Sequence, residues 1–444
     1  MKTKGFLSVT LALLFLSSLS LANGLNLNGL GARATAMGGA FVGLADDYSA
    51  IFWNPAGMTN FSTKYFGFHG EDIIPSGTYK FVVPPPFGTG TPLVNTETSA
   101  KHYLGGMAAF YYPINKNLVA GISVYTPSGL GAKWPTADMA AISNLRTDME
   151  WMSFVGVVSI SPALAYKISD AFSIGVAMNI NYGMFDVKMY AGEATVGPPL
   201  FPVVTTLDFG QYEESMTGWG YGATIGILVK PSPKFSFGLT YKTASTIKFE
   251  GEAKISGLSV LVPFGIKASS TLSRDVTWPM WIGAGIAFKP TDKLTLTADV
   301  QYTNWKKIDT IQTSYDDTIW KNVLMADEAT RYMHWKDATQ IRFGAEYKVS
   351  KALAVRAGYY TDPSPAPDTT LNILLPSYDF NNISFGLGYA LNGLQIDFGF
   401  EYLMGKERDV SFDKVILDPE YEHAQPGTYG MKIIVPFIAI GYKF

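Results

Sequence analysis

The feature that most constrains this chain is an alternation of very short turns and very long loops between segments with β-strand periodicity. Tight connections recur at Asn115-Lys116, Ser169-Asp170, Ser232-Pro233, Thr291-Asp292, Ser350-Lys351 and Asn392-Gly393. Each of these six turns joins two strands, and one further strand at either end of the series makes fourteen. An even number of antiparallel strands, with short turns on one side and long loops on the other, is typical of outer-membrane barrels. The sequence therefore predicts an all-β fold, a fourteen-stranded antiparallel transmembrane barrel.

Within the segments, apolar and polar side chains alternate. Over residues 294–302 the apolar positions are separated by Thr295, Thr297, Asp299 and Gln301. Successive side chains of a strand point to opposite faces, so each strand has one apolar and one polar face. A soluble β-sandwich would bury the apolar face. Segments of about ten residues that recur along the whole chain suit a tilted bilayer crossing better, and aromatic residues near their ends suit an interfacial girdle.

The expected strands follow from this alternation. They are residues 63–71, 102–113, 117–127, 150–167, 172–187, 212–229, 234–249, 268–289, 293–306, 337–349, 352–361, 381–391, 394–405 and 431–444. The last one ends in Phe444, and a terminal aromatic residue resembles the signal that the outer-membrane assembly machinery reads.

The first residues read as a secretory signal peptide, residues 1–22. Lys2 and Lys4 precede a short apolar run, and Ser20-Leu21-Ala22 forms a small-residue cleavage site. Only 16% of residues are charged while 47% are hydrophobic, which suits a barrel whose outer face meets lipid. The chain contains no cysteine, so no disulfide or thiol chemistry is expected, and a net charge of −3 does not suggest nucleic acid.

Residues 23–60, between the signal peptide and the expected barrel of residues 61–444, do not alternate. They are rich in small and apolar residues, and this composition argues against disorder. A barrel of fourteen strands is too wide for side chains alone to fill. We therefore expect this segment to pack inside the lumen.

The same segment resembles the hatch of the FadL/TodX (OMPP1) family of outer-membrane transporters. The similarity covers about residues 29–58, and the strand count and loop lengths extend it over nearly the whole mature chain. It rests on Gly31-Ala32-Arg33-Ala34, Met37-Gly38-Gly39-Ala40, Ala45-Asp46-Asp47 and Asn54-Pro55-Ala56-Gly57. The hatch residues that it singles out are Arg33, Gly38, Gly39, Asp46, Asp47, Asn54, Pro55, Ala56 and Gly57.

The resemblance implies a monomeric barrel plugged by an N-terminal hatch, in the outer membrane of a Gram-negative bacterium. Its partners would be hydrophobic small molecules, namely fatty acids or, in some branches, aromatic hydrocarbons, together with outer-membrane lipid and lipopolysaccharide. In the family the ligand rests in an apolar loop groove, moves to a site in the barrel and leaves sideways at a kink in the third strand, without an energy source. Gly121 and Pro127-Ser128-Gly129 are candidate kink positions, although the second group reads more readily as the end of that strand.

Two long loops are candidates for the apolar groove, because exposed apolar patches mark interaction sites. The candidate residues are Leu200, Phe201, Val203 and Val204 in the third loop and Leu258, Val260, Leu261, Val262 and Phe264 in the fourth. The alternative is that these loops pack on each other and simply cap the barrel.

A carboxylate ligand would require a cation in the lumen, and Arg342 and Arg356 have the interior parity. Glu346, Asp397, Glu401 and Asp299 share that parity, so the sequence favours internal salt bridges that stiffen the barrel as the role of most of these charges. The choice between fatty-acid and aromatic-hydrocarbon transport therefore stays open. A general porin or a structural barrel is a further alternative.

No enzymatic activity, metal site or cofactor is expected. The chain has four histidines, His69, His102, His334 and His423, which the expected strand map places in loops or near strand ends. No nucleophile elbow, zinc motif or catalytic triad spacing accompanies them.

Overall fold

A computed structural model describes residues 24–99, 101–196, 205–325 and 329–444. The predicted signal peptide lies outside the described residues and stays a prediction. Among the residues described, no helix is both long enough and apolar enough to cross a membrane.

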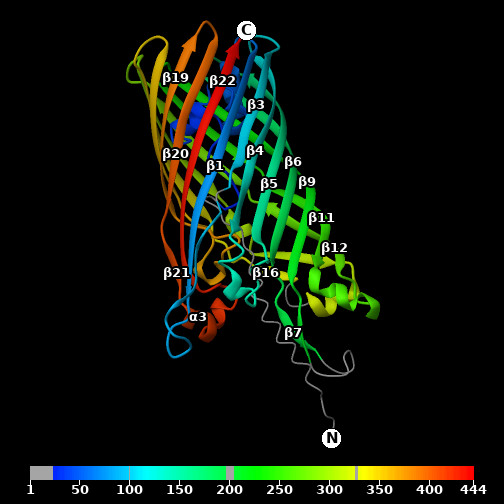
Figure 1. Cartoon of the computed structure of the whole chain (residues 1–444). Coiled ribbons are helices and arrows are strands. Elements are labelled where there is room, and N and C mark those ends of the chain that lie inside the picture. The colour runs from blue at the N-terminus through cyan, green and yellow to red at the C-terminus, as the bar shows by residue number, and fades with distance from the viewer. Residues whose placement is uncertain (1–23, 100, 197–204, 326–328) are drawn as a thin grey trace.

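The fold is a closed antiparallel barrel of fourteen wall strands (Figure 1), as predicted. Its strands are β1 (Tyr65–Val82), β2 (Pro92–Glu97), β3 (Tyr103–Pro113), β4 (Leu118–Trp134), β5 (Trp151–Lys167), β6 (Phe172–Tyr190), β7 (Glu193–Val196), β8 (Thr205–Asp208), β9 (Gln211–Ser232), β10 (Phe235–Lys242), β11 (Ser245–Ile255), β12 (Ser269–Trp278), β13 (Trp281–Phe288), β14 (Leu294–Thr303), β15 (Thr310–Tyr315), β16 (Thr330–Tyr332), β17 (Ala338–Lys348), β18 (Leu353–Asp362), β19 (Phe380–Leu391), β20 (Leu394–Gly405), β21 (Arg408–Val410) and β22 (Gly427–Lys443).

Several wall strands are broken in two. β10 and β11 form one wall strand, β12 and β13 the next, β14 and β15 the next, and β16 and β17 the one after that. β2, β7, β8 and β21 belong to the loops. The ring closes where β1 pairs with β22, from Tyr65 opposite Lys443 to Lys80 opposite Thr428.

The helices are short. They are α1 (Ala32–Ala36), α2 (Ala50–Trp53), η1 (Pro55–Asn60), η2 (Ala140–Ile142), η3 (Ser256–Phe264), η4 (Trp305–Lys307), η5 (Trp320–Leu324), η6 (Asp368–Thr370), α3 (Phe412–Leu417) and η7 (Pro419–Tyr421).

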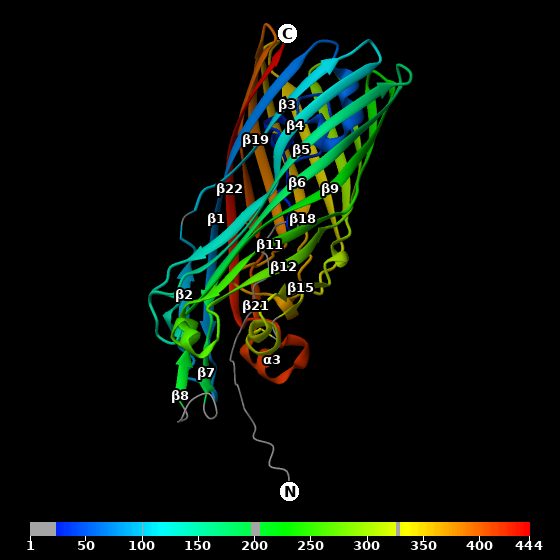
Figure 2. The same cartoon turned by 90° about the vertical axis from the view of Figure 1, so that its right-hand side faces the viewer.

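Most predicted strand ends agree with the structure to within a few residues, but several wall strands run further than predicted. The wall strand of β14 and β15 ends at Tyr315 instead of residue 306, and that of β16 and β17 begins at Thr330 instead of residue 337. β1 continues to Val82 instead of ending near residue 71, and β4 continues to Trp134 instead of ending at Pro127. Both extensions reach into the loop side of the molecule, where Figure 2 shows long strands leaning beyond the barrel body. His69 is therefore a buried lumen residue of β1, and the expectation that it lies near a strand end is wrong.

Alternation decides which face of each strand meets lipid. In β20, for example, Leu394, Ile396, Phe398 and Phe400 are exposed on the outer face while Asp397 and Glu401 are buried inside. The outer face is apolar because no water is available there to solvate polar groups.

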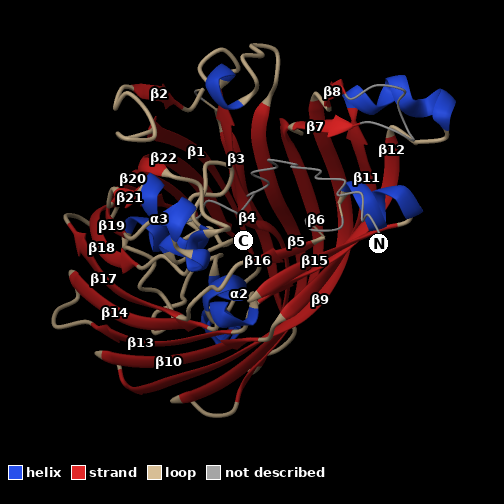
Figure 3. Ribbon diagram, turned by 90° about the horizontal axis from the view of Figure 1, so that it is seen from below, coloured by secondary structure: helices blue, strands red, loops and turns tan. Residues whose placement is uncertain are grey.

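Residues 24–60 lie inside the ring of strands, at the end of the barrel that carries the short turns (Figures 1 and 3). Nearly all of their side chains are buried, and α1 contacts β18, β19 and β20 while η1 contacts β4, β5, β6 and β9. We call residues 24–60 the N-terminal segment. The loop side of the barrel is filled by a second apolar cluster built from loop residues.

Candidate functional site

The N-terminal segment approaches the wall so closely that only glycine fits at two of its positions. Gly38 and Gly39 have positive φ angles of 66° and 65°. A Cβ atom on Gly38 would lie 2.7 Å from the carbonyl oxygen of Phe343, and one on Gly39 would lie 2.3 Å from Nη1 of Arg342. These glycines allow the backbone to lie directly against β17, which explains the Gly38-Gly39 pair of the sequence motif.

A chain of ion pairs fixes the same segment to the wall. Arg33 donates from Nε and Nη2 to the two carboxylate oxygens of Glu346, at 2.7 and 2.9 Å, and also pairs with Asp46. Glu346 accepts a second bond, 2.7 Å long, from Arg356, whose Nη1 lies 2.6 Å from Oδ1 of Asp397. Charged hydrogen bonds with this two-pronged geometry are strong and specific, so the chain locks the segment to β17, β18 and β20.

Asn54 joins the two halves of the segment to the opposite wall. Its Nδ2 donates to the carbonyl oxygens of Val42 and Ile227, at 3.0 and 2.9 Å, and its Oδ1 accepts from the backbone of Ala56. Pro55 then begins η1. These contacts give Asn54 and Pro55 a structural role in the segment.

The remaining polar hatch residues also have local partners. Asp47 accepts from the backbone and hydroxyl of Ser49, at 2.8 and 2.6 Å, just before α2 begins. A Cβ atom on Gly57 would lie 2.0 Å from the carbonyl oxygen of Ala45, so Gly57 folds the segment back on itself.

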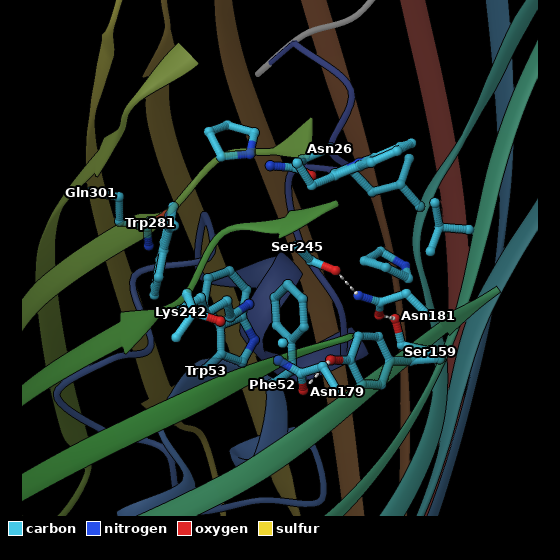
Figure 4. Close-up of a pocket in the computed structure, with 18 of the residues that line it drawn as sticks. Asn26, Phe52, Trp53, Ser159, Asn179, Asn181, Lys242, Ser245, Trp281 and Gln301 are labelled. Carbon is cyan, nitrogen blue, oxygen red and sulfur yellow. Dashed lines mark hydrogen bonds between the residues drawn. The ribbon is translucent and has the colours of Figure 1, made fainter. Parts of the chain in front are cut away.

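Between the N-terminal segment and the loop cluster lies a cavity of about 100 Å³. Figure 4 shows its lining. Its floor is Phe52 and Trp53 of α2, and residues 26–28 run along one edge. The wall is contributed by strands from β4 round to β17.

One side of the cavity wall carries a band of uncharged polar side chains. Asn181 donates to Ser245 at 2.8 Å and accepts from Ser159 at 2.6 Å. One level lower, Asn179 donates to Thr224 at 2.9 Å and accepts from Ser161 at 2.9 Å. These hydrogen bonds run across β5, β6, β9 and β11 and satisfy the amides without any charge.

Lys242 is a cation of this cavity in addition to Arg342, and our sequence analysis did not single it out. It lies at the end of β10, partly buried, with its ammonium 3.4 Å from the ring centroid of Phe52 and 4.9 Å from that of Trp281. Among the residues that the structure describes, no carboxylate lies within 4.0 Å of its ammonium. A cation on aromatic faces with no counter-ion is a suitable partner for an incoming anion.

The two arginines that parity selected have other partners. Arg356 is neutralised by Glu346 and Asp397, as described above. Arg342 lines the cavity, but its Nη1 donates to the carbonyl oxygen of Gly38 and its Nη2 to Gln340, at 2.9 and 2.8 Å. Both therefore hold the N-terminal segment or the wall in place.

The third wall strand, β4, contains the irregularity that its Pro and Gly residues suggested. Its ladder with β3 ends at Tyr125, and its ladder with β5 shifts register between Tyr125 and Ser128. Inside the barrel the N-terminal segment covers this point, because the Leu27 amide donates to the carbonyl of Pro127 at 2.8 Å and the Ser128 hydroxyl donates to the carbonyl of Leu25. Pro127 to Gly129 thus lie within the strand, and the expectation that they end it is wrong.

Of the two loops expected to form the groove, only the fourth is described. Leu200, Phe201, Val203 and Val204 lie outside the described residues. In η3, Leu258 and Leu261 are buried, while Val260, Val262 and Phe264 are more than half exposed. The fourth loop therefore both packs and presents an apolar surface.

A different loop is buried in the apolar cluster on the loop side of the barrel. Residues 371–378, between β18 and β19, are all buried, and the carbonyl oxygen of Ile373 accepts a 2.9 Å bond from the indole of Trp134. The Leu371-Asn372-Ile373-Leu374-Leu375 run was the signal for this burial, and our sequence analysis did not use it. Among the described residues no group of histidines and carboxylates could hold a metal ion.

Comparisons with known proteins agree with this architecture. The family described as outer membrane protein transport protein (OMPP1/FadL/TodX) matches residues 13–443. The long-chain fatty acid transport protein of Escherichia coli O6:H1 is 25% identical over 437 residues, which cover 91% of this chain and 92% of the relative. Outer membrane protein P1 of Haemophilus influenzae is 22% identical and covers 90% of this chain and 93% of its own length.

Two solved structures share the fold. A Pseudomonas aeruginosa FadL homologue has a TM-score of 0.77 at 17% identity, covering 95% of this chain and 100% of its own. The Pseudomonas putida toluene transporter TodX has a TM-score of 0.70 at 16% identity, covering 94% and 99%.

Proposed function

Because this chain belongs to the OMPP1/FadL/TodX family of outer membrane transport proteins, which carry hydrophobic compounds, we propose that its own ligands are long-chain fatty acids. The E. coli relative is named a long-chain fatty acid transport protein. The observation that supports the proposal is Lys242, a cation with no carboxylate within 4.0 Å in the described part of the chain, whose ammonium faces the aromatic rings of the cavity.

In this proposal the carboxylate of the fatty acid pairs with the ammonium of Lys242. The acyl chain lies against Val157, Ile247 and Trp278, which line the same cavity. A hydrogen bond to a charged group contributes about 1.5–3 kcal/mol, so the pair changes affinity by roughly tenfold to a hundredfold.

The remaining steps use the segments described above. Exposed apolar side chains of η3 collect the ligand outside, and the N-terminal segment acts as the hatch. The ligand leaves sideways where β3 and β4 lose their pairing, after residues 25–27 have moved off β4. The family uses no energy source, so the gradient of ligand alone drives this passage.

An aromatic hydrocarbon is the second candidate ligand. Phe52, Trp53, Trp278 and Trp281 surround the cavity, and aromatic rings attract one another edge to face. A neutral ring would make no use of the charge of Lys242, and this difference separates the two candidates.

The test is uptake of labelled oleate and labelled toluene by an outer-membrane transport-deficient strain that carries this protein. We expect Lys242→Gln to lower oleate uptake about tenfold or more and Lys242→Arg to retain much of it, because only the charge is essential. Lys248→Gln, an exposed lysine on neighbouring β11, is the matched control and should leave uptake unchanged.

Toluene uptake that survives Lys242→Gln, with no oleate uptake in the wild type, would assign the protein to aromatic hydrocarbons instead. Passage of small sugars with uptake of neither compound would assign a porin. Deletion of residues 23–58 should open the lumen and make uptake unselective if these residues act as a hatch.

A further inference from the structure

The mouth of the barrel on the turn side is strongly positive, although the chain as a whole has a net charge of −3. Short turns of outer-membrane barrels face the periplasm. Below the N-terminal segment this mouth contains a recess of about 720 Å³, which we call the vestibule. Lys230, Lys234, Lys289 and Lys443 line it.

Further lysines follow the rim around almost its whole circumference. They are Lys64, Lys116, Lys167, Lys293, Lys348 and Lys351, and the turns contain only Asp170 and Asp292 as acidic residues. Only the turn between β19 and β20, Asn392-Gly393, has no charge.

The acidic groups near the vestibule have partners already. Asp170 pairs with Lys167 at 2.6 Å, and Asp46 pairs with Arg33 and lies 4.0 Å from the ammonium of Lys289. Lys230 donates to the side-chain oxygen of Asn60, a neutral group. In the described part of the chain, Lys234 and Lys443 have no carboxylate within 4.0 Å. The vestibule therefore carries positive charge that the protein itself does not neutralise.

The direction in which the vestibule lysines point favours a soluble partner over a lipid. Phe235 and Tyr442 are exposed on the outer, lipid-facing surface, and alternation places their neighbours Lys234 and Lys443 on the lumen side. Lipid headgroups lie outside the wall, where Lys64 has its ammonium 5.1 Å from the ring centroid of the exposed Tyr112. The vestibule lysines instead surround the aqueous mouth.

The size of the vestibule favours a protein as its partner over a small anion. Its lysines come from the ends of β9, β10, β13 and β22, so the charge is spread across the mouth and is not focused on one point. Leu44, Asp46 and Asn60 of the N-terminal segment form its ceiling. We propose that the vestibule is the docking surface for a soluble periplasmic protein that presents a cluster of aspartate and glutamate side chains. Such a partner would contact the N-terminal segment directly, and the proposal needs no assumption about the transported ligand.

The experiment uses the full mature protein in phosphatidylcholine nanodiscs, with a short fluorescent poly-L-glutamate peptide as the acidic probe. We expect the quadruple variant Lys230→Gln, Lys234→Gln, Lys289→Gln and Lys443→Gln to bind the peptide about tenfold more weakly or worse. A control with Lys80, Lys101, Lys306 and Lys307 changed to Gln, all exposed on the loop side, should bind like the wild type. Added salt should weaken the wild-type complex because the charges are exposed.

Since the chain has no cysteine, a single Ser232→Cys substitution gives one thiol at the vestibule, and Thr89→Cys gives one on the loop side. The peptide should quench a fluorophore on Cys at position 232 and not at position 89. The milder pair Lys234→Gln and Lys443→Gln, both at exposed positions, serves if the quadruple variant does not fold.

Three results would overturn the proposal. The first is equal binding by the wild type and the lysine variants, and the second is no binding by the wild type or quenching only at position 89. The third concerns nanodiscs that contain phosphatidylglycerol. Enrichment of this lipid around the wild type, lost in the quadruple variant while peptide binding is unchanged, would assign the lysines to anionic lipid.

Discussion

The two sides of the lumen wall differ in the charge of the side chains that face the N-terminal segment and the cavity. On the side of β17, β18 and β20, buried carboxylates and guanidinium groups pair with one another and with Arg33 of the N-terminal segment. At the level of the cavity, the lumen face of β5, β6, β9 and β11 carries neutral hydroxyl and amide groups that pair among themselves. Nearer the loops, Glu214 of β9 forms a buried ion pair with Arg274 of β12.

This difference shows on which side the N-terminal segment is bound firmly to the wall and on which side it can move away from it. Buried charges have to be paired, so the charged side fixes the segment through bonds that are costly to break singly. Neutral hydrogen bonds contribute less, and those of the cavity wall do not involve the segment. The irregular β3–β4 region adjoins this side, because Tyr125 and Pro127 of β4 line the cavity.

The largest test of this comparison is Glu346→Gln, which removes the carboxylate shared by Arg33 and Arg356. Breaking a buried ion pair from one side costs about 3–5 kcal/mol. We expect amide hydrogen exchange of residues 24–60 to accelerate strongly while the strand amides stay protected. Unchanged exchange in the segment would mean that the charged side does not hold it.

A smaller effect is expected for Asn54→Ala, which removes the bonds to the carbonyls of Val42 and Ile227. Leaving buried polar groups unsatisfied costs about 1–3 kcal/mol. Urea unfolding of the purified barrel should show a loss in this range, and exchange should rise mainly near α2 and η1. If oleate uptake is intact in a folded Asn54→Ala barrel, this residue has no transport role of its own.

The smallest effect is expected on the neutral side. Asn181→Ala removes two hydrogen bonds of the cavity wall, a change of about 0.5–1.5 kcal/mol each. Oleate affinity should change by only a few fold, and exchange of residues 24–60 should match the wild type. Release of the segment in this variant would contradict the division between the two sides.

The alternation of side chains was sufficient to predict the barrel. Period-two segments and short turns located all fourteen wall strands, because every strand must present an apolar face to lipid. Breaks such as Thr243-Ala244 between β10 and β11 were missed, since a local loss of pairing leaves no mark on the alternation.

The site was less predictable because it depends on which charges are neutralised. Arg356 and Lys242 both have interior parity, and nothing in the sequence says that the first meets Glu346 and Asp397 while the second meets Phe52 and Trp281. The partner of a lumen charge comes from a neighbouring strand or from the N-terminal segment, and register and docking decide it. Parity alone would have placed Lys242 inside, since Leu239 and Tyr241 face outward.

The bonds between Leu27 and Pro127 and between Leu25 and Ser128 mean that the barrel wall is completed by a piece of chain that is not a strand. Where the ladder between β4 and β3 ends, the N-terminal segment covers the wall from inside. In the proposed exit step, a single equilibrium, between residues 25–27 bound to β4 and released from it, therefore sets both the leakage and the opening of the wall at this point. A substitution there that reduces leakage also makes opening harder.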